Sequence, residues 1–188
     1  MDRKEQILDV ATELVQTRGY SAFSYQDLSD RLGITKASIH YHFPSKEELG
    51  KAVAERYSRQ VSSYLAGVEA KSAGPWEQLD GYLEMVLGIM KTRDRICAAG
   101  SVQSEINVVP AAMGETMCGL ARHVVGWIAD VIEEGRKQGV MQFPGQASDH
   151  AAMIFSAAQG AMQYGRAQGE KPGRSVLKQI KETMRRKG

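Results

Sequence analysis

The sequence predicts an all-α protein of two parts, and three observations predict it. Apolar residues recur at intervals of three and four along most of the chain, which is the period of an amphipathic helix. No segment alternates apolar and polar residues as a half-buried strand would. Glycines and prolines punctuate the pattern at places where helices end and begin.

The first two expected helices have clear boundaries. The first covers residues 2–18 and stops at Gly19. Its apolar face consists of Ile7, Leu8, Ala11, Leu14 and Val15. A capping box at Ser24 and Asp27 starts the second helix, which stops at Gly33.

The third helix is short, and a long helix follows it. Thr35 is placed to cap the third helix, and Ile39 and Phe43 lie four apart on its inner face. Pro44 interrupts the pattern. A second capping box begins at Ser45 and starts a helix that we expect to reach about residue 70.

The rest of the chain is divided by three prolines at positions where a first helical turn accepts them, namely Pro75, Pro110 and Pro172. The helices expected there are residues 75–90, 99–106, 110–138, 146–168 and 173–186. We expect one domain at residues 1–45 and a second at 46–188.

Charge distribution is more informative than total charge. The formal net charge of +2 is too small to indicate a nucleic-acid partner. Between Asp30 and Glu47, however, there is no carboxylate. This window holds Arg31, Lys36, His40, His42 and Lys46. A local cationic face of this kind is typical of a phosphate-binding surface.

Composition excludes two other classes of protein. The chain has two cysteines, Cys97 and Cys118, too few for a disulfide framework. No apolar run reaches the length of a membrane span, and the N-terminus has no signal-peptide core. We therefore expect a cytoplasmic protein without a membrane partner.

Residues 25–43 form two short helices joined by Gly33-Ile34-Thr35, which is the spacing of a helix-turn-helix. The second of these helices carries an outer stripe opposite its apolar face. The stripe consists of Lys36, Ala37, His40 and Tyr41, with Ser38 at its edge. Small and polar side chains of this kind suit the major groove of DNA. The alternative is a helical hairpin with a solvated polar face.

The stretch GITKASIHYHFPSKEEL, residues 33–49, resembles the recognition helix and following linker of the TetR family of bacterial regulators. The preceding ILDVATELVQTRGYSAFSYQDLSDRLGI is similar to the first two helices of that family. The resemblance covers about the first 50 residues. It implies a homodimeric transcriptional repressor that binds a palindromic double-stranded DNA operator and is released by a small-molecule inducer. No cofactor is implied.

The resemblance also implies roles for single residues. Thr35 would cap the recognition helix and contact phosphate, and Lys46 would hold a phosphate beside the dipole of the following helix. Lys36, Ala37, Ser38, His40 and Tyr41 would face the groove or its phosphate walls. The family most often has Tyr where this chain has His40, with a variable residue next. Because Tyr41 follows here, the separate roles of His40 and Tyr41 stay open.

The second domain is expected to hold the inducer in an apolar cavity. The candidates are apolar, aromatic or sulfur-bearing residues at helical spacing: Tyr64, Leu83, Leu87, Met90, Cys97, Met113, Met117 and Trp127.

Cys97 has two interpretations. It is either a small buried apolar residue or a thiolate favoured by Arg93 and Arg95, which would make the repressor an electrophile or redox sensor. Cys118 is expected to be a packing residue.

No metal site is expected. His40 and His42, two apart on a helix, do not share a face. His123 and His150 have no cluster of ligands at a suitable spacing.

Small residues between 146 and 168 would let this helix approach another closely. In TetR-like proteins, similar C-terminal helices pair with a symmetry mate as a four-helix bundle, so we expect a dimer there, with the helix ending near Gln138 as the partner helix. The long helix that begins at Ser45 is expected to link the DNA site to the ligand site.

A competing hypothesis is a helical enzyme or a protein-binding module. The sequence lacks GxSxG, HExxH, P-loop and GxGxxG motifs, so an enzyme hypothesis has no residues to name. We therefore expect no enzymatic activity.

Overall fold

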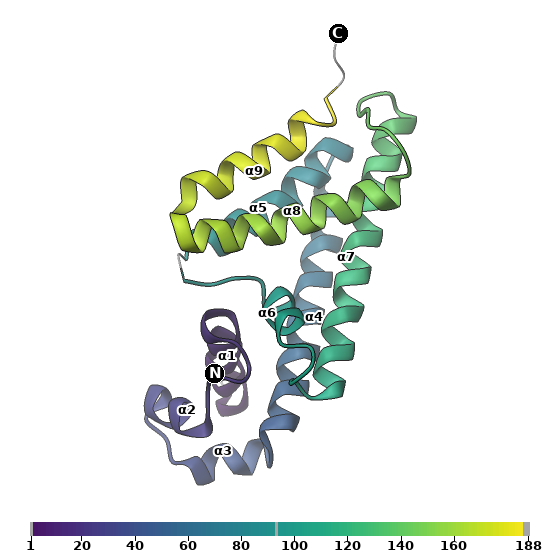
Figure 1. Ribbon diagram of the computed structural model, residues 1–188. Coiled ribbons are helices and arrows are strands. Elements are labelled where there is room, and N and C mark those ends of the chain that lie inside the picture. Colours follow the sequence, from purple (N-terminus) through teal and green to yellow (C-terminus); the bar gives the residue numbers. More distant parts are fainter. Residues whose placement is uncertain (1, 93, 186–188) are drawn as a thin grey trace. The chain divides into compact units, whose positions relative to one another are not determined.

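The computed structural model describes residues 2–92 and 94–185, and within them the chain is helical and has no strand (Figure 1). The helices are α1 (Arg3–Arg18), α2 (Tyr25–Leu32), α3 (Lys36–His42), α4 (Lys46–Lys71), α5 (Pro75–Met90), α6 (Ala98–Ser104), α7 (Ala111–Lys137), α8 (Ala147–Gln168) and α9 (Glu170–Glu182). The predicted all-α fold class is confirmed, and most predicted boundaries agree within two residues.

The last helix differs from the prediction. It begins at Glu170, whereas the sequence pattern placed its start at 173, after Pro172. Pro172 lies within the first turn, where a backbone N–H has no intrahelical partner and its absence costs little. Gly169, at φ 91°, makes the sharp link from α8 to α9. The helix ends at Glu182, and the predicted end at residue 186 lies outside the described residues.

The chain divides into two compact units. Unit 1 comprises residues 1–61 and 98–120, and unit 2 comprises residues 62–97 and 121–188. Helices α4 and α7 each contribute residues to both units. The predicted domain boundary after residue 45 stays a prediction.

The core of unit 1 is built by the apolar faces that the sequence pattern identified. Its buried side chains include Ile7, Leu8, Leu14, Val15, Leu28, Ile39, Phe43, Leu49 and Val53. Helix α1 packs against α2 and α6, and α2 packs against α3. Burying each such side chain contributes roughly 1.5–3 kcal/mol, which favours one arrangement of three short helices that would be unstable alone.

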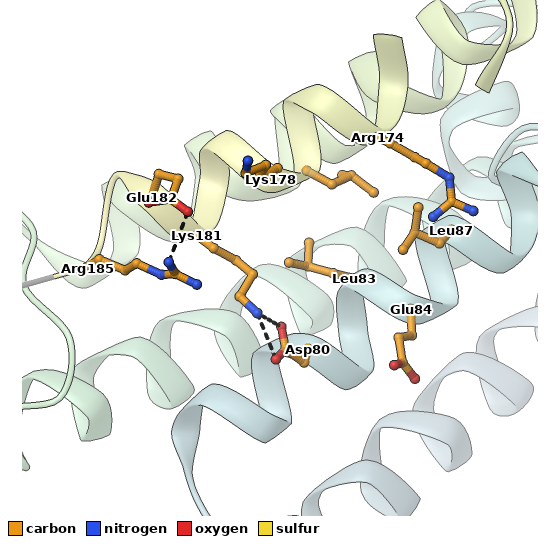
Figure 2. A pocket seen from close by; sticks show the side chains of 10 residues that line it. Asp80, Leu83, Glu84, Leu87, Arg174, Lys178, Lys181, Glu182 and Arg185 are labelled. Atoms are coloured by element: carbon orange, nitrogen blue, oxygen red, sulfur yellow. Dashed lines mark hydrogen bonds and ion pairs between the residues drawn. The ribbon is translucent and has the colours of Figure 1, made fainter. Parts of the chain in front are cut away.

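Unit 2 contains a layer in which α5, α8 and α9 lie side by side (Figure 1). Small residues permit the close packing of α8 on α9, because a Cβ added at Gly173 would lie 2.7 Å from the carbonyl oxygen of Ala161. At the α5–α9 contact the Lys181 ammonium lies 2.6 Å from an Asp80 carboxylate oxygen (Figure 2). The same ammonium lies 5.8 Å from the centre of the Trp76 ring.

No helix in the described ranges is both long and apolar enough to cross a membrane.

Candidate DNA interface and ligand pockets

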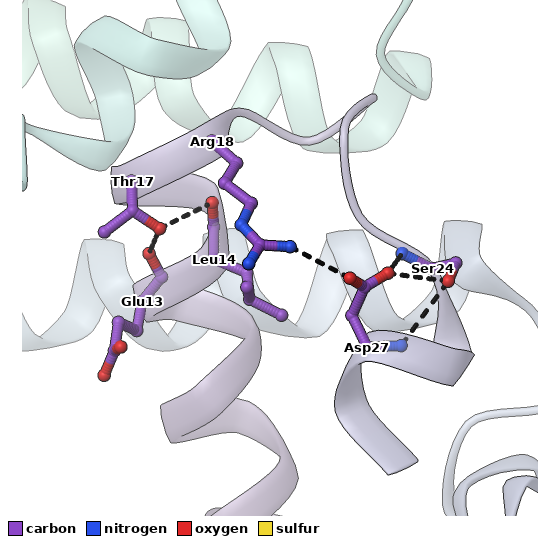
Figure 3. Close-up of polar contacts among 6 residues, drawn as sticks. All are labelled: Glu13, Leu14, Thr17, Arg18, Ser24 and Asp27. Atoms are coloured by element: carbon purple, nitrogen blue, oxygen red, sulfur yellow. Dashed lines mark hydrogen bonds and ion pairs between the residues drawn. The ribbon is translucent and has the colours of Figure 1, made fainter. Parts of the chain in front are cut away.

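The start of α2 is fixed by a complete capping box, as predicted (Figure 3). Asp27 Oδ2 accepts hydrogen bonds from the Ser24 backbone N–H at 2.8 Å and from the Ser24 hydroxyl at 2.7 Å. Arg18 at the end of α1 pairs with Asp27 Oδ1 at 2.9 Å. The Ser24 bonds, and then Arg18, lower the pKa of Asp27, so the carboxylate stays charged at the helix N-terminus.

The turn between α2 and α3 has the geometry of a helix-turn-helix. Gly33 is left-handed (φ 62°, ψ 36°), and its N–H donates to the Ser29 carbonyl. The Ser29 hydroxyl donates to the Ile34 carbonyl. Thr35 caps α3, because its Oγ1 accepts from the Ser38 N–H at 3.2 Å. The predicted capping role of Thr35 is therefore confirmed.

Helix α3 has one buried side and one open side. Ile39 is fully buried, and Phe43, just beyond the helix, is 3% exposed. Thr35, Lys36, Ala37, His40 and Tyr41 are exposed and Ser38 is half-buried, with the Tyr41 side chain 84% exposed. The predicted stripe is thus a continuous outer surface of one helix.

His40 is exposed but its ring is held in place. The ring lies 4.7 Å from the Tyr25 ring, centre to centre. Its Nδ1 lies 3.1 Å from the Pro44 carbonyl oxygen. Tyr25 is itself anchored, because its hydroxyl donates to the Phe43 carbonyl at 2.8 Å. Burial, together with the fields of Tyr20 and Glu48, raises the pKa of Tyr25 to about 12, so it stays a neutral donor.

Lys46 is half-buried, and its ammonium already has partners within unit 1. Nζ donates to the Tyr20 carbonyl at 2.7 Å and lies 4.5 Å and 4.6 Å from the centres of the Tyr20 and Phe23 rings. Burial lowers the pKa of Lys46, while the charges of Glu105 and Asp27 act in the opposite direction. A lysine ammonium has three N–H donors, so the bond to Tyr20 leaves two for another ligand.

The sequence pattern did not identify Glu105, which also holds the α1–α2 turn. Its Oε2 accepts from the Ser21 backbone N–H at 2.8 Å. The buried Ser101 hydroxyl on α6 donates to the Val15 carbonyl near the end of α1, at 2.8 Å. These partners are 84 and 86 residues apart in the chain, and no spacing rule connects residues at such separations.

Comparisons with known proteins agree with this geometry. A family model described as "Bacterial regulatory proteins, tetR family" matches residues 7–53. The crystal structure of a TetR-family transcriptional regulator from Agrobacterium tumefaciens is 30% identical, with 97% of each chain covered and a TM-score of 0.93. The chain belongs to the TetR family of transcriptional regulators.

Two further comparisons extend over most of the chain. A TetR transcriptional regulator from Legionella pneumophila is 27% identical, with 98% of each chain covered and a TM-score of 0.89. The transcriptional repressor NemR of Escherichia coli K12 is 23% identical over 163 residues, which cover 85% of this chain and 82% of NemR.

Four of the predicted ligand residues of this TetR-family chain line three separate pockets. Leu83 and Leu87 line a pocket of about 540 Å³ between α5 and α9 (Figure 2). Tyr64 lines another of about 600 Å³ beside α4 and α5, where its hydroxyl donates to the Gly81 carbonyl at 3.0 Å. Trp127 lines a third of about 440 Å³.

The other predicted ligand residues do not line these pockets. Met90 is 5% exposed in unit 2, whereas Met113 and Met117 are fully buried in unit 1. Cys97 is half-buried and lies in the chain segment that connects α5 to α6. Their role as ligand contacts stays a prediction.

The α5–α9 pocket has charged walls, and these residues were not among the predicted ligand contacts, which were chosen for apolar, aromatic or sulfur-bearing character. Its lining adds Asp80, Glu84, Arg174, Leu177, Lys178, Lys181, Glu182 and Arg185 to the two leucines. The signal in the sequence was the basic series at positions 174, 178, 181 and 185, which repeats at helical spacing. Several of these charges are paired within the chain, Lys181 with Asp80 and Arg185 with Glu182.

The remaining cysteine and histidine side chains form no cluster. Neither Cys97 nor Cys118 is in a disulfide, and both are half-buried. Arg93, one of the two arginines proposed to favour a Cys97 thiolate, lies outside the described residues. Across residues 2–92 and 94–185, no three His, Cys, Asp or Glu side chains gather as a metal site would require.

Proposed function

We propose that this TetR-family regulator is a repressor that binds a palindromic operator as a homodimer and is released by a small-molecule inducer. The observation that carries the proposal is the exposed outer surface of α3, in a helix-turn-helix whose inner side is buried. Repression in particular is supported by the similarity to NemR, which is named a repressor and matches most of the chain.

The proposed DNA contacts are Thr35, Lys36, Ala37, Ser38, His40, Tyr41 and Lys46. The N-terminal residues of a recognition helix reach base edges, so Lys36 and Ala37 are proposed to face bases. Lys46 begins α4, and its two remaining N–H donors are proposed to bind a phosphate.

The proposed dimer surface is on α8. From Ala151 to Gly165 this helix has no charged residue, yet Met153 is 45% exposed and Tyr164 is 52% exposed. Uncharged exposed surface that includes large apolar side chains is typical of interfaces. A two-fold dimer would present two recognition helices to half-sites about one helical turn apart.

The test begins with a duplex enriched from a random DNA library by the wild-type protein. Fluorescence anisotropy then compares Lys36→Ala and Tyr41→Ala with a control, Lys178→Ala, which removes an exposed lysine from α9. We expect the two α3 variants to weaken binding about fivefold or more and the control to bind as wild type. Failure to enrich any duplex, or equal affinity of all four proteins, would refute the proposal.

The inducer test uses the reciprocity of linked binding. An inducer that weakens DNA binding by some factor must itself bind the DNA-bound protein more weakly by the same factor, typically about 5–150-fold. Because α4 contributes to both units, we propose that it transmits this effect. Calorimetric titration of any ligand that releases DNA, with and without the duplex, measures the factor for the ligand, and anisotropy of the duplex with and without that ligand measures the factor for DNA.

A further inference from the structure

We propose that His40 binds a DNA phosphate in its protonated, imidazolium form, so that DNA binding takes up a proton at this residue. The proposal rests on the proposed function, because it specifies the state in which one residue of the proposed interface binds.

The contacts of His40 determine which ring nitrogen is left for DNA. A carbonyl oxygen only accepts hydrogen bonds, so Nδ1 must carry a hydrogen to bond with Pro44 at 3.1 Å. In the neutral ring the lone pair is therefore on Nε2. Contact with the Tyr25 ring, which lies 4.7 Å away centre to centre at a tilt of 58°, helps to hold the ring in this orientation, and the residue is exposed. Nε2 is thus the polar atom available to a ligand.

The position of the ring favours phosphate over a base. In a helix-turn-helix the first helix crosses the DNA backbone, and the N-terminal residues of the second read bases. His40 is the fifth residue of the seven-residue α3. Its ring packs at a tilt against Tyr25, the first residue of α2, and Nδ1 donates to the Pro44 carbonyl beyond the end of α3. Both contacts direct it toward the backbone-crossing helix and away from the base-reading end of α3.

A phosphate oxygen is only an acceptor, and so is Nε2 of the neutral ring described above. The two would oppose each other. Protonation turns Nε2 into a donor and adds a positive charge, which gives a charge-assisted hydrogen bond while the bond to Pro44 is kept. Binding to phosphate through Nε2 therefore requires a proton.

The titratable groups around the ring come from three helices. Tyr25 of α2 is neutral, with its pKa at about 12, and Glu48 of α4 acts on that phenol. On α3 itself, Lys36 lies four residues earlier, and the His42 ring is edge-on to Tyr41 at 5.2 Å. His42 is the other histidine of α3, so it is the matched control.

The experiment measures affinity for the enriched duplex by anisotropy at constant salt, between about pH 6 and about pH 8. In wild type we expect affinity to rise as pH falls, approaching about tenfold per pH unit for each proton taken up. His40→Gln should remove this dependence, because an amide donates at every pH. His42→Gln should keep it. Calorimetry in buffers of different ionisation enthalpy should show about one proton fewer per protomer for His40→Gln.

Three outcomes would overturn the proposal: a pH dependence unchanged in His40→Gln, its loss in His42→Gln, or an affinity that rises with pH, which would mean that the neutral ring reads a base. Absence of DNA binding by every variant at every pH would instead refute the proposed function. If His40→Gln does not fold, His40→Tyr replaces it. A tyrosine keeps a ring beside Tyr25 and a hydroxyl donor at all these pH values, so it is also expected to bind without pH dependence.

Discussion

The Glu105 carboxylate accepts a hydrogen bond from the backbone N–H of Ser21 at 2.8 Å, although the two residues are 84 positions apart. Lys46 donates to the carbonyl of the same peptide group, that of Tyr20, at 2.7 Å, so the Tyr20–Ser21 peptide of the α1–α2 turn is bonded at both its N–H and its C=O. The segment that follows α6 is therefore part of the support of the helix-turn-helix.

The backbone conformation of Gly19, beside this contact, predicts that replacing Gly19 lowers the stability of the fold. Gly19 has φ 93° and ψ 163°, a backbone conformation that essentially only glycine adopts, and an added Cβ would lie 1.9 Å from Glu105 Oε1. We expect Gly19→Ala to lower the free energy of unfolding by about 1–3 kcal/mol, measured by urea denaturation.

Two comparisons separate the causes. Gly33→Ala tests backbone strain alone, since nothing lies within 4 Å of its added Cβ, and should cost about 1 kcal/mol. The double variant Gly19→Ala/Glu105→Ala should lose less free energy of unfolding than the two single variants lose together. Strict additivity would show that the clash with Glu105 does not contribute.

The ion pairs of Arg56 should respond differently to the loss of the arginine and to the loss of its acidic partners, as measured by the free energy of unfolding. Its guanidinium on α4 is 11% exposed, and Nη1 lies 2.7 Å from Asp9 and 3.1 Å from Glu5, whose side chains are half exposed. Replacing both acids by amides leaves a buried charge without its counter-ions. Replacing Arg56 by Met leaves two carboxylates that water can reach. We expect the double variant Glu5→Gln/Asp9→Asn to lose about 2–4 kcal/mol by urea denaturation, and Arg56→Met less. The reverse order would contradict this explanation.

His150 predicts a loss of stability in mild acid. Its ring stacks on Phe143 at 4.8 Å, and its Nε2 is buried without a hydrogen-bond partner. Burial lowers the pKa of His150. As the pH falls, His150 of the unfolded chain therefore binds a proton near pH 6.5, whereas His150 of the folded chain binds it only at a lower pH. The stabilisation is complete above about pH 6.5 and is lost as pH falls toward the lowered value in the folded state.

The melting temperature between about pH 7.5 and about pH 5.5 measures this effect. In His150→Phe, which keeps an aromatic ring against Phe143, the melting temperature should fall less over the same range. An equal slope in both proteins would assign the pH dependence to other groups.

Loss of the Lys46 side chain should change both DNA affinity and stability, whereas loss of Lys36 should change DNA affinity alone. Lys46→Ala is expected to weaken DNA binding, flatten the logarithmic salt dependence by about one unit, and lower the melting temperature, because it also removes the bond to Tyr20. Lys36 is exposed, so Lys36→Ala should affect binding alone. Lys46→Met keeps the apolar stem beside Tyr20 and Phe23 and should recover part of the stability but not the binding. Full DNA affinity of Lys46→Ala would remove Lys46 from the interface.

Gly160 offers a test of the proposed dimer surface. It is exposed on α8, and an added Cβ would meet nothing within 4 Å in the monomer. We expect Gly160→Arg to fold, since arginine favours a helix more than glycine does, but to be monomeric by light scattering. The matched control is Gly88→Arg on α5, another exposed helical glycine with open space around it, which should stay dimeric. A dimer unaffected by Gly160→Arg would place the interface elsewhere.

The sequence by itself determined the local structure and the outer surface of the DNA-binding motif. The capping box of α2, its end at Gly33 and the Thr35 cap follow from contacts within a few residues, so spacing was enough to predict them. For the same reason, the exposed stripe from Lys36 to Tyr41 could be read from helical periodicity. The α9 boundary was misplaced because Pro172 was read as a start, although a first turn accepts proline at more than one position.

Only the tertiary structure decided which distant residues meet. Periodicity tells which side of a helix is buried, but not which other helix covers it. It therefore could not show that Glu105 holds Ser21, that Lys46 lies on Tyr20 and Phe23, or that the His40 ring is fixed between Tyr25 and Pro44. The same limit applies to the predicted ligand residues: Leu83 and Leu87, Tyr64, and Trp127 line three different pockets, because pocket walls are set by packing between helices.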